Sequence, residues 1–229
     1  MTPLEYRIIS IGTLPAHPLW DEGAPVRTGH ATTTLITAGE AKILVDPALP
    51  PQALAARLSE RSNIRHDQIT HVFITTFTQD HYRGLALFES ARWFVHEPEQ
   101  QVAGEALESQ LRHARENGDP ETARAVSGHL ELLNRCEAAG DQLAPGVDLF
   151  PLPGLSPGTC GLLLSLPAST VLICGDAVPT IEHLQQGKVL PECIDIEQAQ
   201  ESFREAIEIA DVLILGRDNI AYNPLRRVM

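Results

Sequence analysis

Short apolar runs separated by polar turns recur along the chain, and their β-branched and aliphatic residues predict strands. Two longer patterns, Gln52–Arg61 after a Pro-Pro pair and Glu197–Ile209, have helical spacing instead. Strand-rich blocks that each end in a helix indicate an α/β (α+β) fold with two mixed sheets and helices outside them. The predicted strands are Tyr6–Ile11, Thr32–Thr37, Lys42–Val45, His71–Ile74, Trp93–His96, Val147–Leu152, Gly161–Leu166, Thr170–Cys174 and Val212–Leu215.

The segment from about residue 97 to 140 is charged and rich in Ala and Leu, unlike the rest of the chain. It predicts two helices, Gln100–Glu116 and Pro120–Ala139, with Asp119 capping the second. We interpret the segment as a helical insertion within a single domain of residues 1–229. Two interpretations stay open: the helices pack on the domain, or they cover a pocket or form a homodimer contact.

Composition narrows the class of protein. The chain of 229 residues carries a net charge of −13, which disfavours nucleic acid and anionic membranes as partners. The sequence holds no apolar run of membrane-spanning length and no basic-then-apolar start typical of a signal peptide. We therefore expect a cytoplasmic protein, and the scattered cysteines 136, 160, 174 and 193 are expected to be reduced, mostly buried thiols.

The richest candidate chemistry follows the apolar run that ends at Ile74. Thr75 to Gly84 reads TTFTQDHYRG, a polar loop of the kind that presents side chains to a pocket. Its spacing resembles the His-x-His-x-Asp-His signature of the metallo-β-lactamase superfamily. Asp80 and His81 match that signature, whereas Thr76 and Thr78 stand at its two earlier histidine positions.

Three later motifs extend the resemblance from about Tyr6 to Asn219. Residues 153–159, PGLSPGT, are similar to the family's Pro-Gly-His-Thr-Pro-Gly-His loop, with Leu155 at the ligand position and Thr159 at the second histidine. Residues 171–177, VLICGDA, resemble the strand that delivers the bridging aspartate, here Asp176. Residues 214–219 resemble the ending that supplies the last histidine ligand, here Arg217.

The resemblance implies a metallo-β-lactamase-like αββα sandwich, and residues 175–190 resemble the N-acyl-homoserine lactonase branch most. That branch often carries a Tyr three residues after the bridging Asp, where this chain has Pro179.

The resemblance also implies two metal positions. The first would be held by residues 76, 78 and 155, which here are two threonines and a leucine. The second would be held by Asp80, His81, Asp176 and residue 217. Zinc prefers imidazole, thiolate and carboxylate ligands, and a guanidinium has no lone pair to offer. We therefore expect no metal or other cofactor, with a single zinc or similar divalent ion at Asp80, His81 and Asp176 as the alternative.

Arg217 suggests what replaces the metal. Two close carboxylates, Asp80 and Asp176, need a positive partner in a partly buried pocket, and a guanidinium can bridge both. The competing interpretation is that Arg217 turns outward and Asp80 only caps the following helix. His81 is either a general base or a packed remnant of the metal site.

Further candidates are weaker. Asp46, at a strand end that borders the site in the family, is expected to support it from behind. His30, His66, His71, His96 and His183 lack ligand spacing and are expected to be surface or satisfied interior residues, and Cys174 is expected to be inert.

Two functions follow from this reading. The first is a metal-free, non-catalytic relative of lactonase-like hydrolases that binds a small molecule in a pocket of Thr76, Thr78, Leu155, Asp176 and Arg217, or acts through its surface. The second is a hydrolase of esters or lactones that works with one weakly bound metal, or without metal through His81, with Asp80 and His81 as the catalytic candidates. Function has to be argued from the site rather than from the fold.

Overall fold

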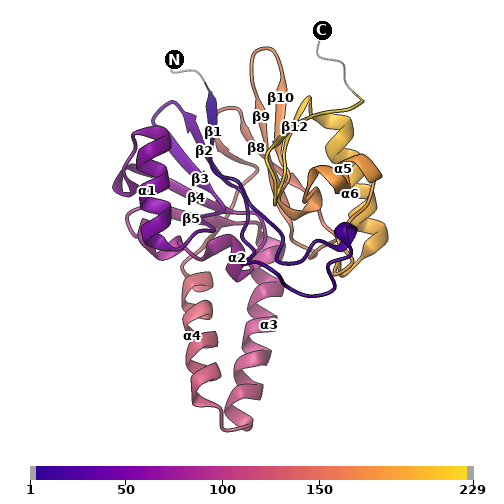
Figure 1. Cartoon of the computed structure of the whole chain (residues 1–229). Coiled ribbons are helices and arrows are strands. Elements are labelled where there is room, and N and C mark those ends of the chain that lie inside the picture. The colour runs from indigo at the N-terminus through magenta and orange to yellow at the C-terminus, as the bar shows by residue number, and fades with distance from the viewer. Residues whose placement is uncertain (1–3, 226–229) are drawn as a thin grey trace.

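Two six-stranded sheets lie face to face in the computed structural model, which describes residues 4–225 (Figure 1). The first sheet has the order β1-β2-β3-β4-β5-β6 and the second β12-β11-β10-β9-β8-β7. Parallel and antiparallel pairs occur in both sheets, as predicted. The strands are β1 Glu5–Ser10, β2 Thr33–Ala38, β3 Ala41–Val45, β4 His71–Ile74, β5 Arg92–Val95, β6 Glu137–Ala138, β7 Gln142–Ala144, β8 Val147–Pro151, β9 Cys160–Ser165, β10 Thr170–Ile173, β11 Val212–Ile214 and β12 Ile220–Tyr222.

Helices cover the outer faces of the two sheets, so the predicted αββα sandwich is confirmed. Helix α1 lies outside the first sheet, and α5 and α6 lie outside the second (Figure 1). The α-helices are α1 Pro51–Ser62, α2 Gln79–Tyr82, α3 Glu97–Glu116, α4 Pro120–Asn134, α5 Ile181–Gln186 and α6 Ile196–Ile209. Short 3-10 turns occupy Pro18–Trp20, His66–Gln68, Leu85–Phe88 and Gly175–Ala177.

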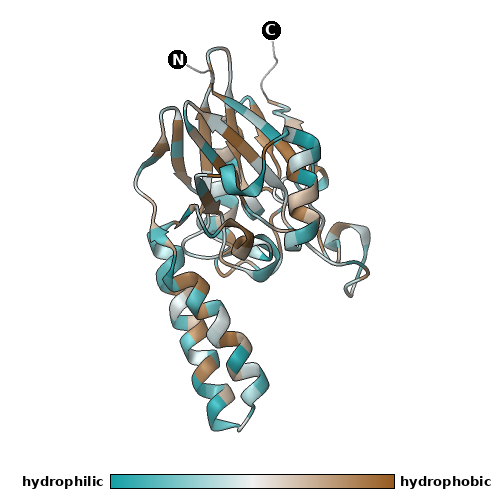
Figure 2. Ribbon diagram, turned by 90° about the vertical axis from the view of Figure 1, so that its left-hand side faces the viewer, coloured by the Kyte–Doolittle hydropathy of each residue, from teal (hydrophilic) through white to brown (hydrophobic). Residues whose placement is uncertain are grey.

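Side-chain alternation along the central strands fills three apolar layers. In β3, Ile43 and Val45 enter the layer between the sheets, and Leu44 points to the layer on the α1 side. In β10, Ile173 faces the other sheet while Leu172 packs toward the α6 side. Successive strand residues point to opposite faces, so each strand serves two layers. Apolar residues accordingly concentrate on the strands inside the sandwich (Figure 2).

The segment predicted as an insertion forms a hairpin of α3 and α4 that projects from one end of the sandwich (Figures 1 and 2). The predicted cap is present, because the Asp119 carboxylate accepts a hydrogen bond from Thr122 N at 3.0 Å. The two helices pack chiefly against each other, and Leu107 and Leu133 join the core at the base.

Two predicted boundaries in this region are wrong. The second helix ends at Asn134 rather than Ala139, because Glu137 and Ala138 pair with Phe94 and Val95 as a sixth strand of the first sheet. His96 does not continue the strand before it, since it precedes the first turn of α3. Within residues 4–225, no helix combines the length and apolarity needed to cross a membrane.

Candidate functional site

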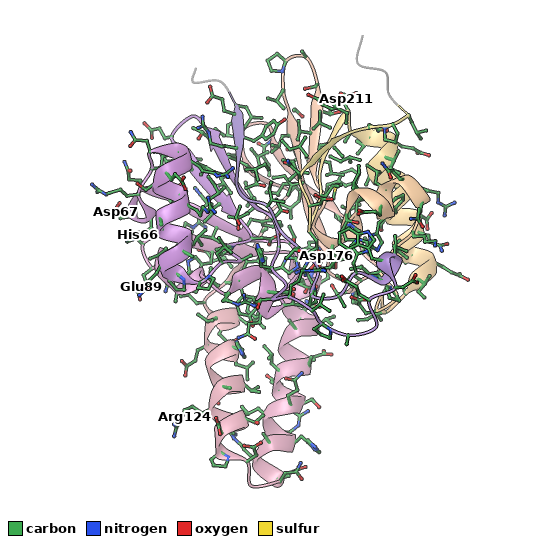
Figure 3. The ribbon with its side chains drawn as sticks, in the orientation of Figure 1. His66, Asp67, Glu89, Arg124, Asp176 and Asp211 are labelled. Carbon is green, nitrogen blue, oxygen red and sulfur yellow. The ribbon has the colours of Figure 1, made fainter. Side chains whose placement is uncertain are left out.

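Four loops meet at the end of the sandwich from which the hairpin projects. They follow β4, β8, β10 and β11, and they carry the stretches that the sequence singled out. Strands β10 and β11 are parallel, so the residues after their carboxyl ends, Asp176 and Arg217, emerge at the same edge. Asp176 lies at this edge, whereas Asp211 lies near the opposite end of the sandwich, away from the hairpin (Figure 3).

Gly216 explains how Arg217 comes so close to Asp176. A Cβ atom at position 216 would lie 2.3 Å from the Gly175 carbonyl oxygen and 2.7 Å from Asp176 Oδ1. Only a residue without a side chain allows the two loops to touch. Arg217 N then donates to the Pro179 carbonyl at 2.7 Å, which fixes the start of the side chain.

The Arg217 guanidinium bridges the two aspartates. Its Nε donates to Asp176 Oδ1 at 2.7 Å and its Nη2 to Asp176 Oδ2 at 2.6 Å, a bidentate pair. Its Nη1 donates to Asp80 Oδ2. Arg217 is 6% exposed and Asp176 5% exposed, so the pair is withdrawn from water. The outward orientation of Arg217 considered above is therefore wrong.

His81 lies beneath this bridge, fully buried between two carboxylates. Its Nε2 is 3.0 Å from Asp176 Oδ2, and its Nδ1 is 3.2 Å from Asp46 Oδ2. Asp46 also accepts from Thr75 N at 2.9 Å and Thr75 Oγ1 at 2.7 Å. Asp46 thus holds the start of the TTFTQDHYRG loop and contacts Nδ1 of the imidazole, the supporting position expected for it.

The charges of these groups stabilise one another. Burial alone would lower the pKa of His81, but the Asp46 and Asp176 carboxylates outweigh it and raise that pKa to about 10. Burial would likewise raise the pKa of Asp176, yet Arg217 and His81 hold it well below its usual range. Burial would also raise the pKa of Asp80, but the neighbouring His81 and Arg217 lower it. Near neutral pH the Asp80 and Asp176 carboxylates therefore remain charged beside the guanidinium of Arg217.

The residues at the first metal position do not match zinc chemistry. Thr76 donates its hydroxyl to Thr159 Oγ1 at 3.3 Å, Thr78 donates to Asp80 Oδ1 at 2.8 Å, and Leu155 is an aliphatic wall of the cavity. None of the three offers an imidazole, thiolate or carboxylate.

At the second position the three ligand-type side chains are present but already engaged. The guanidinium of Arg217 contacts Asp80, His81 and Asp176 at once, with Nη2 2.9 Å from His81 Nε2. A cation of fixed charge therefore lies against the lone pairs that a metal would need.

A cavity of about 430 Å³ opens in front of this cluster and is lined by all the predicted pocket residues and by Asp80. His81, the other catalytic candidate, is buried behind it. Thr76, Thr78, Asp80, Asp176 and Arg217 form the polar end. Apolar side chains of three separate segments form the walls: Leu14, Val102, Ala103, Ala106, Leu190 and Ile194. Helix α3 thus supplies one wall, in agreement with the interpretation that this hairpin covers a pocket.

Glu99 is a cavity residue that the sequence reasoning missed. It lies in the first turn of α3, is 3% exposed, and accepts from Phe77 N at 2.7 Å and from Ser156 Oγ. Ser156 in turn lies 3.0 Å from Thr159 Oγ1. The carboxylate therefore ties the loop after β4 to the loop after β8. A signal existed, since α3 begins earlier than its charged pattern suggested and Glu99 sits directly after the helix-opening Pro98.

The remaining histidines and cysteines lie outside the cluster. His183 is fully buried with His17, 5.3 Å away between ring centres, and both point a ring nitrogen at the Thr180 hydroxyl. Their other nitrogens, His17 Nδ1 and His183 Nε2, have no hydrogen-bond partner among the described residues, so the expectation that His183 is satisfied is only half right. The four cysteines are free, and burial raises the pKa of the Cys136 and Cys160 thiols to about 12.

Comparison with known proteins covers most of the chain. The family model described as "Metallo-beta-lactamase superfamily" matches residues 26–215. Curated relatives include probable metallo-hydrolases of Mycobacterium tuberculosis and Mycobacterium bovis, each 31% identical over 144 residues, or 57% of this chain. The aligned part spans only 44% of the length of either relative.

Solved structures with the same fold include lactonases. A Thermotoga maritima protein assigned to the metallo-beta-lactamases has a TM-score of 0.69 at 20% identity, covering 96% of this chain and 99% of that one. AidC, a dizinc quorum-quenching lactonase, has a TM-score of 0.69 at 13% identity over 99% and 89% of the two chains. Bacillus thuringiensis AiiA with N-decanoyl-L-homoserine bound has a TM-score of 0.65 at 19% identity over 95% and 94%.

Proposed function

Because the chain belongs to the metallo-beta-lactamase superfamily, we propose that it is a metal-free member that binds a small molecule in the cavity before Arg217. In this proposal the guanidinium takes the electrostatic role of the metals. The cavity volume of about 430 Å³ and its mixture of apolar walls with a few polar groups suit a small organic ligand.

The observation that carries the proposal is the three-way contact of Arg217. A buried carboxylate pair is costly without a cation, and here the cation is covalently part of the chain. The bidentate contact with Asp176 and the bond to Asp80 use the oxygens that would face a metal. Without a metal to lower the pKa of a bound water, hydroxide attack on an ester or lactone loses its usual driving force.

A hydrolase that uses one weakly bound metal is the second candidate. It is favoured by the metallo-hydrolase names of the curated relatives and by the retention of Asp80, His81 and Asp176. This candidate requires Arg217 to leave its place, since the guanidinium contacts all three side chains.

Elemental analysis of the purified protein separates the two candidates. We expect less than stoichiometric zinc, iron or manganese after expression with each metal supplied and desalting. The matched comparison is the quadruple variant Thr76→His, Thr78→His, Leu155→His and Arg217→His, which restores the family's ligand types and should retain metal. One or more tightly held metal ions per wild-type chain, with lactone hydrolysis that a chelator and Asp176→Ala abolish, would establish the hydrolase instead.

A further inference from the structure

Carboxylates outnumber cations around the cavity. Four acidic side chains line it, Asp80, Glu99, Asp176 and Glu192, against the single guanidinium of Arg217. That guanidinium is already paired with Asp176 and Asp80, and the buried His81 behind it contacts Asp176 and Asp46. The cavity therefore keeps a net negative charge after all these pairs are formed.

Glu99 contributes a buried carboxylate to this net negative charge. Glu99 is only 3% exposed, and its carboxylate accepts hydrogen bonds from a backbone amide and a hydroxyl. Among residues 4–225, no ion pair joins Glu99 to a basic side chain. Buried charges in proteins are ordinarily paired, so a carboxylate on a cavity wall without a counter-charge points to a cation that arrives with the ligand.

Asp80 is the second acceptor at the same cavity. Its side chain is 27% exposed, and within residues 4–225 its Oδ1 accepts one hydrogen bond, from Thr78 Oγ1 at 2.8 Å. A carboxylate oxygen accepts more than one hydrogen bond, so Oδ1 keeps capacity toward the cavity.

From these contacts we propose that the cavity receives a ligand with a positively charged nitrogen on an apolar body, the nitrogen held by Asp80 and Glu99. The inference rests on the proposed function and adds the chemical class of the ligand. An ammonium group has donors for both carboxylates, and its bonds to them are charge-assisted. The apolar body lies against Val102, Ala103 and Ile194, side chains that line the cavity from two segments.

The charge of the cavity also disfavours the alternative ligands. A carboxylate ligand would share the cavity with four acidic side chains, and the donors of Arg217 are already engaged. A bound dication would reverse this preference, because it would make the polar end of the cavity attract anions. The sign of the preferred ligand charge therefore tests the inference independently of any turnover.

The experiment compares three probes with the same alkyl chain, hexylamine, hexanol and hexanoate, by calorimetric titration of the full chain at pH 7. We expect hexylamine to bind at least about tenfold more tightly than hexanol, as a charged hydrogen bond allows, and hexanoate to bind most weakly. Ala106→Trp, which puts a bulky side chain on the cavity wall, should abolish binding of all three.

Two charge-removing variants assign the amine to its site. Asp80→Asn and Glu99→Gln should each lower hexylamine affinity about tenfold more than they lower hexanol affinity. Glu105→Gln removes the same charge from an exposed position of α3 and should change nothing, which controls for the overall charge of −13. Asp80→Asn carries the test alone if the buried Glu99→Gln variant does not fold.

The outcomes separate the two levels of the proposal. Binding of hexanol or hexanoate as tight as that of hexylamine, blocked by Ala106→Trp, would overturn the ligand charge and keep the binding function. An amine preference that Asp80→Asn and Glu99→Gln leave unchanged would overturn the assigned site. Absence of binding by all three probes would overturn the binding function together with this inference.

Discussion

The charge balance of the site depends on the guanidinium of Arg217. Arg217→Gln takes the guanidinium away from Asp176, which is 5% exposed, and from Asp80, whose side chain is 27% exposed. We expect a loss of about 3–5 kcal/mol in the free energy of unfolding, measured by urea denaturation. Arg124→Gln, on the projecting hairpin (Figure 3), should cost less than about 0.5 kcal/mol.

The second variant in this series tests charge rather than packing. Arg217→Gln combined with Asp176→Asn removes both members of the bidentate pair and should recover part of the lost stability. Equal stability of Arg217→Gln and the wild-type protein would contradict the structural role given to the bridge.

His183 predicts a pH dependence of stability. Burial lowers its pKa to about 4 in the folded protein, with the neighbouring His17 acting in the same direction, against an ordinary value of 6.5. Between about pH 6.5 and pH 4, the His183 side chain therefore binds a proton in the unfolded chain but stays neutral in the folded one. This contribution is complete above pH 6.5 and is lost as pH falls from about 6.5 to about 4, amounting to up to about 3 kcal/mol.

Urea denaturation of the wild-type protein and His183→Gln across that pH range measures this contribution. The difference in free energy of unfolding between the two should shrink as the pH falls. A difference that stays constant from pH 7 to pH 4 would mean that the buried imidazole does not remain neutral.

Single residues show where sequence reasoning works and where it stops. Asp80, His81, Asp176 and Arg217 come from three motifs that lie far apart in the chain, and the resemblance of these motifs to the family pattern was enough to predict that the four residues meet. Glu99 belongs to no motif, and its carboxylate reaches the loops only because α3 starts against them. Such a contact depends on the placement of a whole helix, which local pattern does not encode.

At the scale of elements, the start of α3 is locked to the loop after β8. A Cβ atom at Gly158 would lie 1.9 Å from Glu99 N, backbone against backbone, so no side chain can move aside. We expect Gly158→Ala to destabilise the fold by about 1–3 kcal/mol, as overpacking does, and to lower the affinity of the cavity. Thermal unfolding and calorimetric titration measure the two effects.

Gly128→Ala in α4 is the matched control, because a Cβ there has no atom of the described residues within 4 Å. Helix propensity predicts that this change raises stability by up to about 1 kcal/mol. If the two alanine variants behaved alike, the close contact at Gly158 would not be what positions α3.

Elements with local signals were predicted well, and those that depend on distant partners were not. The helix ends at the turn of the hairpin depend on neighbouring residues such as the cap Asp119. The end of α3 at Glu116 and the start of α4 at Pro120 were therefore predicted correctly. Residues 137–138 look helical in isolation and become β6 because β5 offers them a free edge. The same reason applies to β12, whose partner strand within residues 4–225 is β11.

At the scale of the whole molecule, the hairpin is joined to the sandwich mainly at its base. Its apolar side chains are used between α3 and α4, and the large exposed apolar residues lie elsewhere, including Trp20, Ile194 and Tyr222. Dimerisation through these helices stays a prediction. The αββα architecture itself could be predicted because four motifs that resemble those of the superfamily occur in order along the chain. Their loops meet at the same end of the sandwich.

The projecting hairpin connects the cavity wall to a point far from the cavity. Its first helix forms a cavity wall in its first half and extends for 20 residues, about 30 Å at the usual rise per residue. A tilt of about 5° at the base, the scale of a small wall adjustment, would move the far end by about 2.5 Å over that length. Any tilt of α3 at its base would therefore be amplified along the hairpin, with the largest displacement at the end that projects away from the sandwich (Figure 1).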